Sequence, residues 1–314
     1  MNENILITGG TGFVGTHLVK ALIEKGTPAQ KIHVTSLSGD PSYLEGILPE
    51  ENFHKIDLTE ANHVLDLFEK ILPKEIYNLA GFSATGLSIE KKSLTLSVNI
   101  NIQLNVLEAI KLKTPESRLL SIGSATEYAV SSEPLTEDSP LGPRNPYAVS
   151  KVTQEMLAYS YHVEGINVVH VRPFNHIGEY QARGFVVSDF AYQITQEIEK
   201  GLKNNIHVGN LDVRRDFSDV KDVVQAYILL MEKGVSGEIY NIGSGKDVSI
   251  RELLEKLKSL STTDFEIIID QNKQRSSDAE KSVASITKIR KLGWEPTITL
   301  DTTLERIVKW WREQ

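Results

Sequence analysis

The amino-acid sequence predicts an α/β fold, in which a doubly wound parallel sheet carries a smaller, discontinuous lobe. Short apolar segments of strand length alternate with amphipathic segments of helix length over most of the 314 residues. The first apolar segment ends in glycines and leads directly into a helix pattern. The alternation breaks at 178–217 and again from 246 onward, so these two pieces are expected to lie over the carboxyl edge of the sheet.

The individual elements follow from the hydrophobic periodicity. The first strand is predicted at 5–8, and the first helix at 12–25, where Val14, Leu18 and Leu22 share one face. Gly26 then supplies a typical helix C-terminus. Further strands are predicted at 32–35, 53–56, 75–79, 118–123, 166–172 and 238–242, and further helices at 60–71, 94–111 and 146–163. The predicted large domain covers 1–173 and 218–245, and the predicted small lobe covers 174–217 and 246–314.

Composition excludes several classes of function. The net charge is −8 and no cluster of Lys and Arg stands out, so neither nucleic acid nor an anionic membrane is expected as a partner. The absence of cysteine rules out disulfides, thiolate metal sites and cysteine nucleophiles. The histidines lack the spacing of metal ligands, and no metal is expected. With no basic-then-apolar leader and no apolar run of membrane-spanning length, a cytoplasmic protein is expected.

The glycines after the first strand predict a dinucleotide site. Gly9 allows a tight turn, Gly12 lets the backbone approach a pyrophosphate, and Gly15 lets the helix pack closely on the strand. The helix N-terminus adds unpaired N–H groups and a partial positive charge. The residues expected to bind the cofactor here are Gly9, Thr11, Gly12, Phe13, Val14 and Gly15.

A second constellation lies at 145–151. Asn145 can cap a helix that begins at Pro146, which places Tyr147 and Lys151 on one face. A neighbouring ammonium favours a phenolate, so Lys151 is expected to lower the pKa of Tyr147 and make it an acid or base for a substrate oxygen. A solvated surface pair is the alternative for such a spacing alone. Ser124, at a predicted strand end, is the best-placed hydroxyl partner.

With these residues in place, the chain resembles the extended short-chain dehydrogenase/reductase family, in its nucleotide-sugar branch. Ser124, Tyr147 and Lys151 match the catalytic triad of that family. The later segments 174–178, 208–211 and 215–222 are similar to GDP-4-keto-6-deoxy-D-mannose reductases and their GDP-mannose 4,6-dehydratase relatives. The resemblance implies further cofactor contacts at Asp57, Leu58, Leu79, Ala80 and Gly81, with Tyr147 and Lys151 also touching the cofactor, and substrate contacts at Ser83, Ser124, Asn175, Arg215 and Arg275.

The resemblance also implies roles for other residues. Arg215 and Arg275 would hold the nucleotide diphosphate, for which the planar guanidinium fork is suited. Asn99 would brace the helix of Lys151, directly or through water. His176, near the sugar pocket, is expected to make a structural hydrogen bond rather than relay protons. The aspartates Asp216, Asp219 and Asp222 are expected to cap a helix start.

One departure bears on the reaction. Dehydratases of this branch carry a Glu two residues before the tyrosine that matches Tyr128, and here that position is Thr126. The carboxylate has moved to Glu127, and a shift of one residue at a strand end turns a side chain to the other face. Carbonyl reduction or 4-epimerisation is therefore favoured over elimination.

The end of the second predicted strand bears on the cofactor. NAD-binding proteins commonly place an acidic residue there, but this chain has no carboxylate until Asp40. Ser36 is expected to bond a 2′-phosphate, although Leu37 occupies the place of a helpful arginine. NADP is therefore the expected cofactor, with NAD as the alternative.

Together these observations predict an NADPH-dependent reductase of a nucleotide-linked 4-keto-6-deoxyhexose. A 4-epimerase that retains NAD is the alternative, and a 4,6-dehydratase or a non-catalytic dinucleotide sensor ranks below it. The resemblance further implies a homodimer through the helices of Asn99 and Tyr147. Leu94, Val98, Ile102 and Val106 give the first of these helices an apolar stripe, which could equally belong to the core of one subunit.

Overall fold

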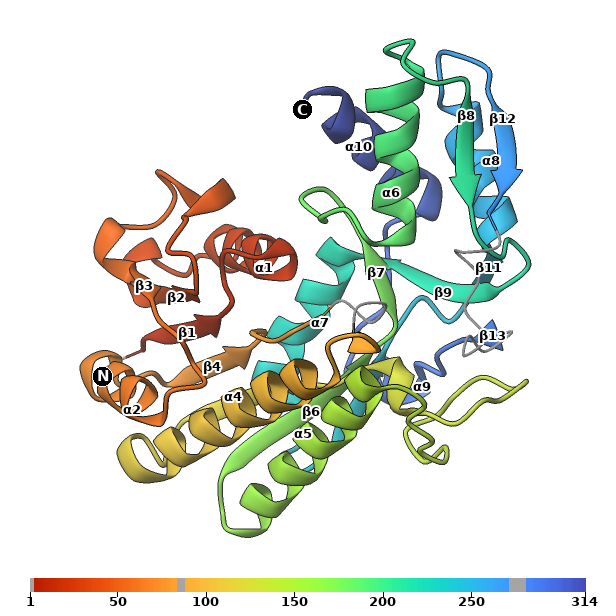
Figure 1. Cartoon of the computed structure of the whole chain (residues 1–314). Helices are drawn as coiled ribbons and strands as arrows, with labels where there is room; N and C mark the ends of the chain where they lie inside the picture. The colour runs from red at the N-terminus through yellow and green to blue at the C-terminus, as the bar shows by residue number, and fades with distance from the viewer. Residues whose placement is uncertain (1–2, 84–87, 271–280) are drawn as a thin grey trace.

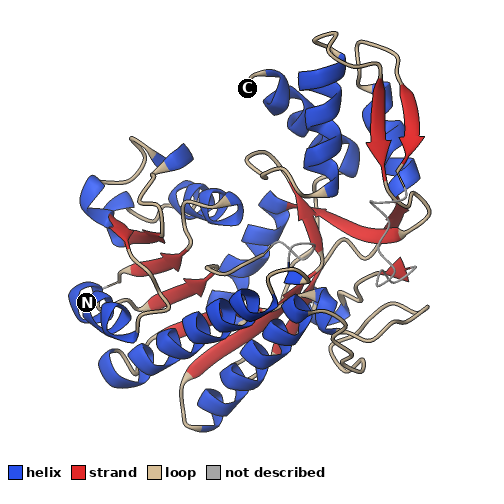
Figure 2. Cartoon of the chain, in the orientation of Figure 1, coloured by secondary structure: helices blue, strands red, loops and turns tan. Residues whose placement is uncertain are grey.

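The structure is a computed structural model that describes residues 3–83, 88–270 and 281–314. Two lobes lie side by side, a larger one that contains the N-terminus and a smaller one that contains the C-terminus (Figure 1). The larger lobe is built on one seven-stranded sheet, and the smaller lobe on two short sheets flanked by helices (Figure 2).

The large sheet is parallel throughout and has the strand order β10-β6-β5-β4-β1-β2-β3. The order reverses beside β1, and in such sheets ligands bind at the carboxyl ends of the strands near that reversal. The predicted doubly wound sheet is confirmed. Its strands are β1 (Ile5–Thr8), β2 (Ile32–Ser36), β3 (Phe53–Lys55), β4 (Glu75–Asn78), β5 (Arg118–Ile122), β6 (Asn167–Pro173) and β10 (Ile239–Ile242).

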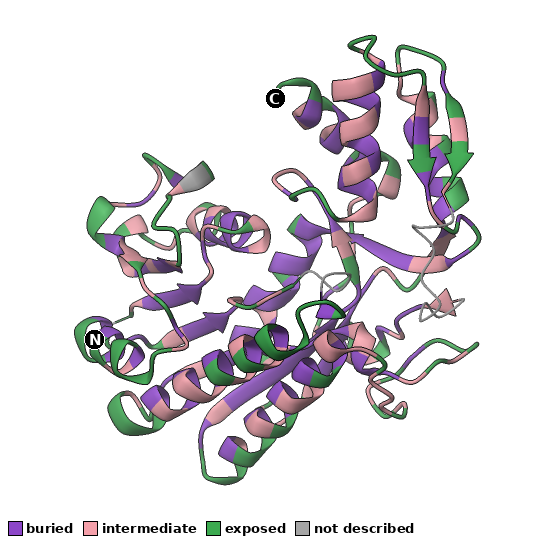
Figure 3. Ribbon diagram, in the orientation of Figure 1, coloured by how far each residue is buried: buried purple, intermediate pink, exposed green. Residues whose placement is uncertain are grey.

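Helices cover both faces of this sheet. The core on one face joins the sheet to α1 (Phe13–Glu24) and α7 (Val220–Lys233). The core on the other face joins it to α2 (Ala61–Ile71), α4 (Lys92–Lys113) and α5 (Pro146–Val163). Because both faces are covered, the central strands are buried along their length (Figure 3).

The apolar side chains of helix α4 pack mainly within this chain. Ile102 and Val106 of the predicted apolar stripe are buried in the core of this same chain, while Leu94 is exposed. The stripe therefore packs mainly in the core of one subunit, which was the alternative to a dimer contact. Within the described residues, no helix has both the length and the apolar composition needed to cross a membrane.

The smaller lobe gathers segments that are distant in sequence around a separate core. In one of its sheets β9 pairs with β7, β11 and β13, and in the other β8 pairs with β12. Its elements are β7 (Asn175–Ile177), α6 (Val186–Tyr192), η5 (Gln193–Ile198), β8 (Asn205–Val208), β9 (Arg214–Asp219), β11 (Asp247–Ser249), α8 (Ile250–Ser259), β12 (Glu266–Ile269), β13 (Lys281–Ser282) and α10 (Leu300–Arg312). Single-turn 3₁₀ helices lie at η1 (Ala29–Lys31), η2 (Ser42–Leu44), η3 (Glu50–Asn52) and η4 (Ala125–Glu127).

One segment near the C-terminus packs against the larger lobe. Helix α9 (Thr287–Arg290) contacts β10, and its Ile289 lies in the core of the large sheet together with Ala284, Ile286 and Trp294. The predicted division of the chain into 1–173 with 218–245 and 174–217 with 246–314 stays a prediction. Within the last of these pieces, however, the residues around α9 pack against the sheet of the larger lobe.

Candidate active site

The glycine turn after β1 has the geometry that a phosphate-binding turn needs. Gly9 has a φ of +63°, a conformation that side chains rarely adopt, and a Cβ there would lie 3.1 Å from the backbone of Ala80. A Cβ on Gly15 would lie 2.5 Å from the backbone of Gly10, so only glycine lets α1 pack this closely. Gly12 is exposed at the start of α1, and no side chain caps the helix there. The N-terminal amides of α1 therefore remain available to an anion.

The neighbouring strand ends surround this turn. The Thr8 hydroxyl donates to Asn78 at 2.6 Å and accepts from the Ala80 amide at 3.0 Å, which ties the end of β1 to the loop after β4. Asp57, after β3, accepts from the amide and hydroxyl of Thr59 at 2.9 and 2.7 Å, and these bonds hold its pKa below the usual value. Of the other predicted cofactor residues, Thr11, Phe13, Val14, Leu79 and Ala80 are half-buried, Leu58 is buried and Gly81 is exposed.

The first turn of α5 positions the predicted catalytic pair. Asn145 caps the helix by accepting from the Ala148 amide at 2.8 Å, and Pro146 occupies the first turn, as the sequence predicts. Tyr147 and Lys151 lie on the same face, with the Lys151 ammonium 5.7 Å from the centre of the Tyr147 ring. Lys151 is buried, and its ammonium donates to the carbonyl of Ile122 at 2.8 Å. The pair thus faces the end of β5 and is not a solvated surface pair.

Ser124 lies at the same strand end and starts the short helix η4. Its hydroxyl oxygen accepts from the amide and hydroxyl of Thr126 at 3.2 and 2.9 Å. These bonds fix the oxygen and leave the hydroxyl proton of Ser124 for another acceptor. An interaction with Ser124 also lowers the pKa of Tyr147, which places the two hydroxyl groups together.

The pKa of Tyr147 differs from the one that the sequence predicts. Burial is the largest influence and raises the pKa of Tyr147 to about 12, with Ser124 lowering it and Glu127 raising it further. Burial also lowers the pKa of Lys151 to about 8. The sequence argument expected Lys151 to lower the pKa of Tyr147, but it ignored desolvation, which disfavours both charged forms. A phenol in this environment stays protonated at neutral pH.

Asn99 braces this region through direct hydrogen bonds. Its amide donates to the Ser150 hydroxyl at 2.9 Å, and Ser150 donates to the Tyr147 carbonyl at 2.7 Å. Asn99 also accepts from the Phe82 amide at 2.7 Å, which joins the loop after β4 to the first turn of α5. Gly81 permits this approach, because a Cβ there would lie 2.8 Å from the Asn99 side-chain oxygen.

The predicted substrate residues are dispersed around the junction of the two lobes. Asn175 is exposed at the start of β7, and Arg215 is half-buried on β9 and donates to the Arg214 carbonyl at 2.9 Å. Ser83 is exposed in the loop after β4. His176 makes the expected structural hydrogen bond, to the Phe174 carbonyl at 3.0 Å. Arg275 lies outside the described residues.

Behind the triad lies a buried charged cluster that the sequence reasoning missed. Arg172 on β6 makes two hydrogen bonds to Glu155 on α5, at 2.8 and 2.7 Å, and His170 lies 3.3 Å from the same carboxylate. Glu127 completes the cluster, and all four side chains are at most 4% exposed. One signal was available, since Glu155 follows Lys151 by four residues and so shares its helix face.

Comparison with known proteins identifies this arrangement. The family model of GDP-mannose 4,6 dehydratase matches residues 6–307. The chain belongs to this family. GDP-6-deoxy-D-mannose reductase from Pseudomonas aeruginosa is 34% identical over 320 residues, which cover 100% of this chain and 99% of that protein.

Solved structures of the family agree with the fold. RMD from Pseudomonas aeruginosa, complexed with NADPH, has a TM-score of 0.85 at 33% identity, and the match covers 99% of both chains. UDP-glucose 4-epimerase from Thermotoga maritima, with UDP-glucose, has a TM-score of 0.87 at 27% identity, again over 99% of both chains. The predicted fold class and the predicted family are both confirmed.

Within this family, the position of Glu127 distinguishes the chain from the dehydratase pattern described above. The sequence argument expected that a shift of one residue would turn the carboxylate away from the site. Glu127 is indeed fully buried, and its carboxylate lies beside His170 and Arg172. The carboxylate of Glu127 thus lies in the protein interior.

Proposed function

We propose that the protein is an NADPH-dependent reductase of a nucleotide-linked 4-keto-6-deoxyhexose, of the GDP-4-keto-6-deoxymannose type. The full-length similarity to GDP-6-deoxy-D-mannose reductase carries the proposal. The placement of Ser124, Tyr147 and Lys151 at one strand end supports it chemically. A cysteine-free chain also fits a reducing, cytoplasmic compartment.

The proposed chemistry needs one acid at the sugar carbonyl. The nicotinamide, when bound, supplies the hydride for the carbonyl carbon. Tyr147, which stays protonated at neutral pH, donates its proton to the carbonyl oxygen, and Ser124 donates a hydrogen bond to the same oxygen. Lys151 holds the nicotinamide ribose. Ser83, Asn175, Arg215 and Arg275 remain proposed contacts of the nucleotide sugar.

A substrate panel tests the proposal. We expect NADPH to be consumed in a one-to-one ratio with a GDP-linked 4-keto-6-deoxy sugar, with weaker turnover of dTDP-, UDP- and CDP-linked analogues. NMR of the product gives its stereochemistry. An epimerase would instead purify with bound NAD and interconvert 4-epimers without net consumption of NADPH. Tight NADPH binding with no turnover across the panel would favour a dinucleotide sensor.

Lys55 supplies the cation that the end of β2 lacks. It is paired with Ser36 in the parallel register of β2 and β3, and its stem lies against Gly39, where a Cβ would be 2.9 Å from the Lys55 side chain. Ser36 and Ser38 lie 3.1 Å apart through their hydroxyl oxygens in the same loop. Lys55 therefore stands beside the hydroxyls proposed to bond a 2′-phosphate.

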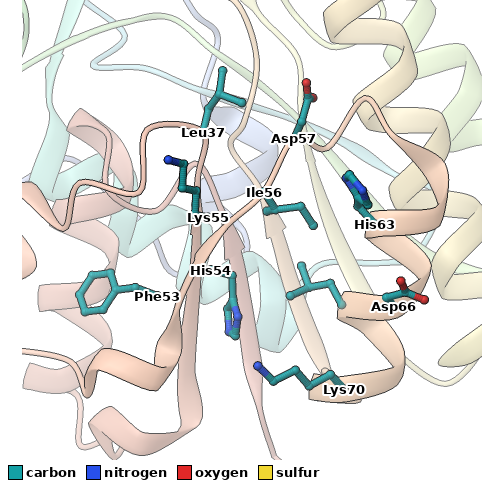
Figure 4. A pocket seen from close by; sticks show the side chains of 10 residues that line it. Leu37, Phe53, His54, Lys55, Ile56, Asp57, His63, Asp66 and Lys70 are labelled. Carbon is teal, nitrogen blue, oxygen red and sulfur yellow. The ribbon is translucent and has the colours of Figure 1, made fainter.

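A charge-removing substitution tests this role. Lys55→Met keeps the stem on Gly39 but removes the ammonium, and we expect the KM for NADPH to rise about tenfold with the KM for NADH unchanged. Lys70→Met is a matched control, because Leu37 and Lys55 lie toward one end of a groove of about 710 Å³ and Lys70 toward the other (Figure 4). Equal effects on NADPH and NADH would argue against a contact with the 2′-phosphate.

We also propose that the protein is a homodimer through α4 and α5. The outward face of α5 carries Val149, Met156, Tyr159 and Val163, which are 40%, 49%, 60% and 69% exposed. Four large apolar side chains along one helix face are unusual for a surface that meets only water. The sequence did not predict this face; its only apolar stripe for a dimer contact was placed on α4.

The dimer proposal has a direct test. Met156→Glu places a charge in the middle of the exposed face, and we expect sedimentation velocity to show a monomer where the wild type is a dimer. Leu202→Glu is the control, since Leu202 is 72% exposed in the smaller lobe. A monomeric wild type, or a dimer that both variants retain, would contradict the proposed interface.

A further inference from the structure

We propose that Glu127 is a positioning residue for the reaction, which fixes the backbone that carries Ser124 and serves as the buried counter-charge of Lys151. This inference rests on the proposed function. It concerns a carboxylate that touches neither substrate nor cofactor and acts only through Ser124 and Lys151.

The backbone of 122–124 is held from two sides. Lys151 donates to the Ile122 carbonyl at 2.8 Å, and the Ser124 amide donates to a Glu127 carboxylate oxygen at 2.6 Å. Gly123 stands between them, and a Cβ on it would lie 2.3 Å from that Glu127 oxygen and 2.4 Å from the His170 ring. The close approach of carboxylate to backbone therefore depends on this glycine.

The guanidinium of Arg172 lies beside both carboxyl groups of the cluster. Arg172 engages both oxygens of Glu155 and lies 3.5 Å from the second oxygen of Glu127, which makes no hydrogen bond among the described atoms. His170 is neutral, because burial lowers its pKa to about 4. Two basic side chains, Arg172 and Lys151, thus lie buried with two acidic ones, Glu155 and Glu127.

A metal ion is the competing occupant of this cluster. Glu127, Glu155 and His170 have potential ligand atoms within 4.8 Å of one another. Both oxygens of Glu155 already accept hydrogen bonds from Arg172, however, and a divalent cation would lie beside that guanidinium. The charge of Arg172 therefore disfavours a cation at this position.

The negative charge of Glu127 shifts the pKa values of Tyr147 and Lys151 in the same direction. Burial raises the pKa of Glu127 itself, while the charges of Arg172 and Lys151 and the hydrogen bond from the Ser124 amide lower it. Its negative charge raises the pKa of Lys151 and that of Tyr147. Removal of the charge should therefore lower both pKa values. Since reduction needs a protonated Tyr147, the alkaline limb of the rate should move to lower pH.

The test is Glu127→Gln, whose amide oxygen can still accept from the Ser124 amide. We expect kcat to fall about tenfold with the KM for the sugar nucleotide within about twofold of wild type, and the alkaline limb of kcat to move down by about one pH unit. Glu127→Ala, which also loses the hydrogen bond, should reduce kcat further. A folded Glu127→Gln variant with the wild-type pH profile would reduce Glu127 to a structural cap and overturn the proposal.

A matched control and a second readout separate this proposal from the proposed function. Ser249 and Glu252 form the same reciprocal cap at the start of α8, so Glu252→Gln should leave kcat and its pH profile unchanged. NMR titration of ¹³C-labelled lysine, assigned with Lys151→Met, measures the pKa of Lys151 without any turnover. A lower value in Glu127→Gln supports the counter-charge even if the substrate panel fails, and an unchanged value refutes it.

Discussion

Tyr147→Phe is expected to reduce kcat by about 10²- to 10⁴-fold, the usual contribution of a positioned proton donor. The phenol is the acid in this site, because burial raises its pKa to about 12 and Ser124 lies beside it. The ring of phenylalanine keeps the packing of the first turn of α5. The affinity for NADPH, measured by calorimetry, should therefore change by no more than about threefold.

Tyr159→Phe is the matched control for this experiment. Tyr159 lies on the same helix but on the outward face proposed for the dimer contact, where it is 60% exposed in the single chain. Tyr159→Phe keeps the ring in that face, so the loss of its hydroxyl should leave kcat unchanged. If Tyr147→Phe kept wild-type activity, Tyr147 would be removed from the mechanism and the proposed reduction would need another acid.

Asp216→Ala is expected to lower the free energy of unfolding by about 3–5 kcal/mol, because it removes a buried carboxylate that accepts four hydrogen bonds and leaves the buried Ala284 amide without an acceptor. The carboxylate of Asp216 is fully buried on β9. It accepts from the amide and hydroxyl of Ser244 at 2.7 and 2.6 Å, from the Gly245 amide at 3.0 Å and from the Ala284 amide at 3.1 Å. One side chain thus joins the smaller lobe to the turn after β10 and to the segment before α9.

Urea denaturation followed by circular dichroism measures this loss. Asp301→Ala is the control, since Asp301 is an exposed partner of Lys256 at 2.6 Å and its loss should cost no more than about 0.5 kcal/mol. A similar small change in both variants would show that the Asp216 hydrogen bonds contribute little net stability.

Asp216 also shows a limit of sequence reasoning. The spacing of Asp216, Asp219 and Asp222 suggested that all three cap one helix. Asp219 does cap α7, by accepting from the Lys221 amide at 2.8 Å. Asp216 lies on the preceding strand instead, and its partners are 28 to 68 residues away along the chain. A local pattern could not identify them.

The sequence by itself determined those features of this protein that depend on neighbouring residues. The glycine turn, the helix start at Asn145 and Pro146, and the alternation of strands and helices each follow from local backbone geometry and periodicity, and the structure confirms them. The family resemblance also rested on such local motifs, and the comparisons bear it out.

Only the tertiary structure decided the electrostatics of the site and the use of its surfaces. The pKa of Tyr147 rises rather than falls, Glu127 pairs with His170 and Arg172 on β6, and the exposed apolar face lies on α5 rather than α4. The physical reason is common to all three. Desolvation and charge pairing depend on which distant segments pack around a side chain, and the strand order of the sheet sets that packing.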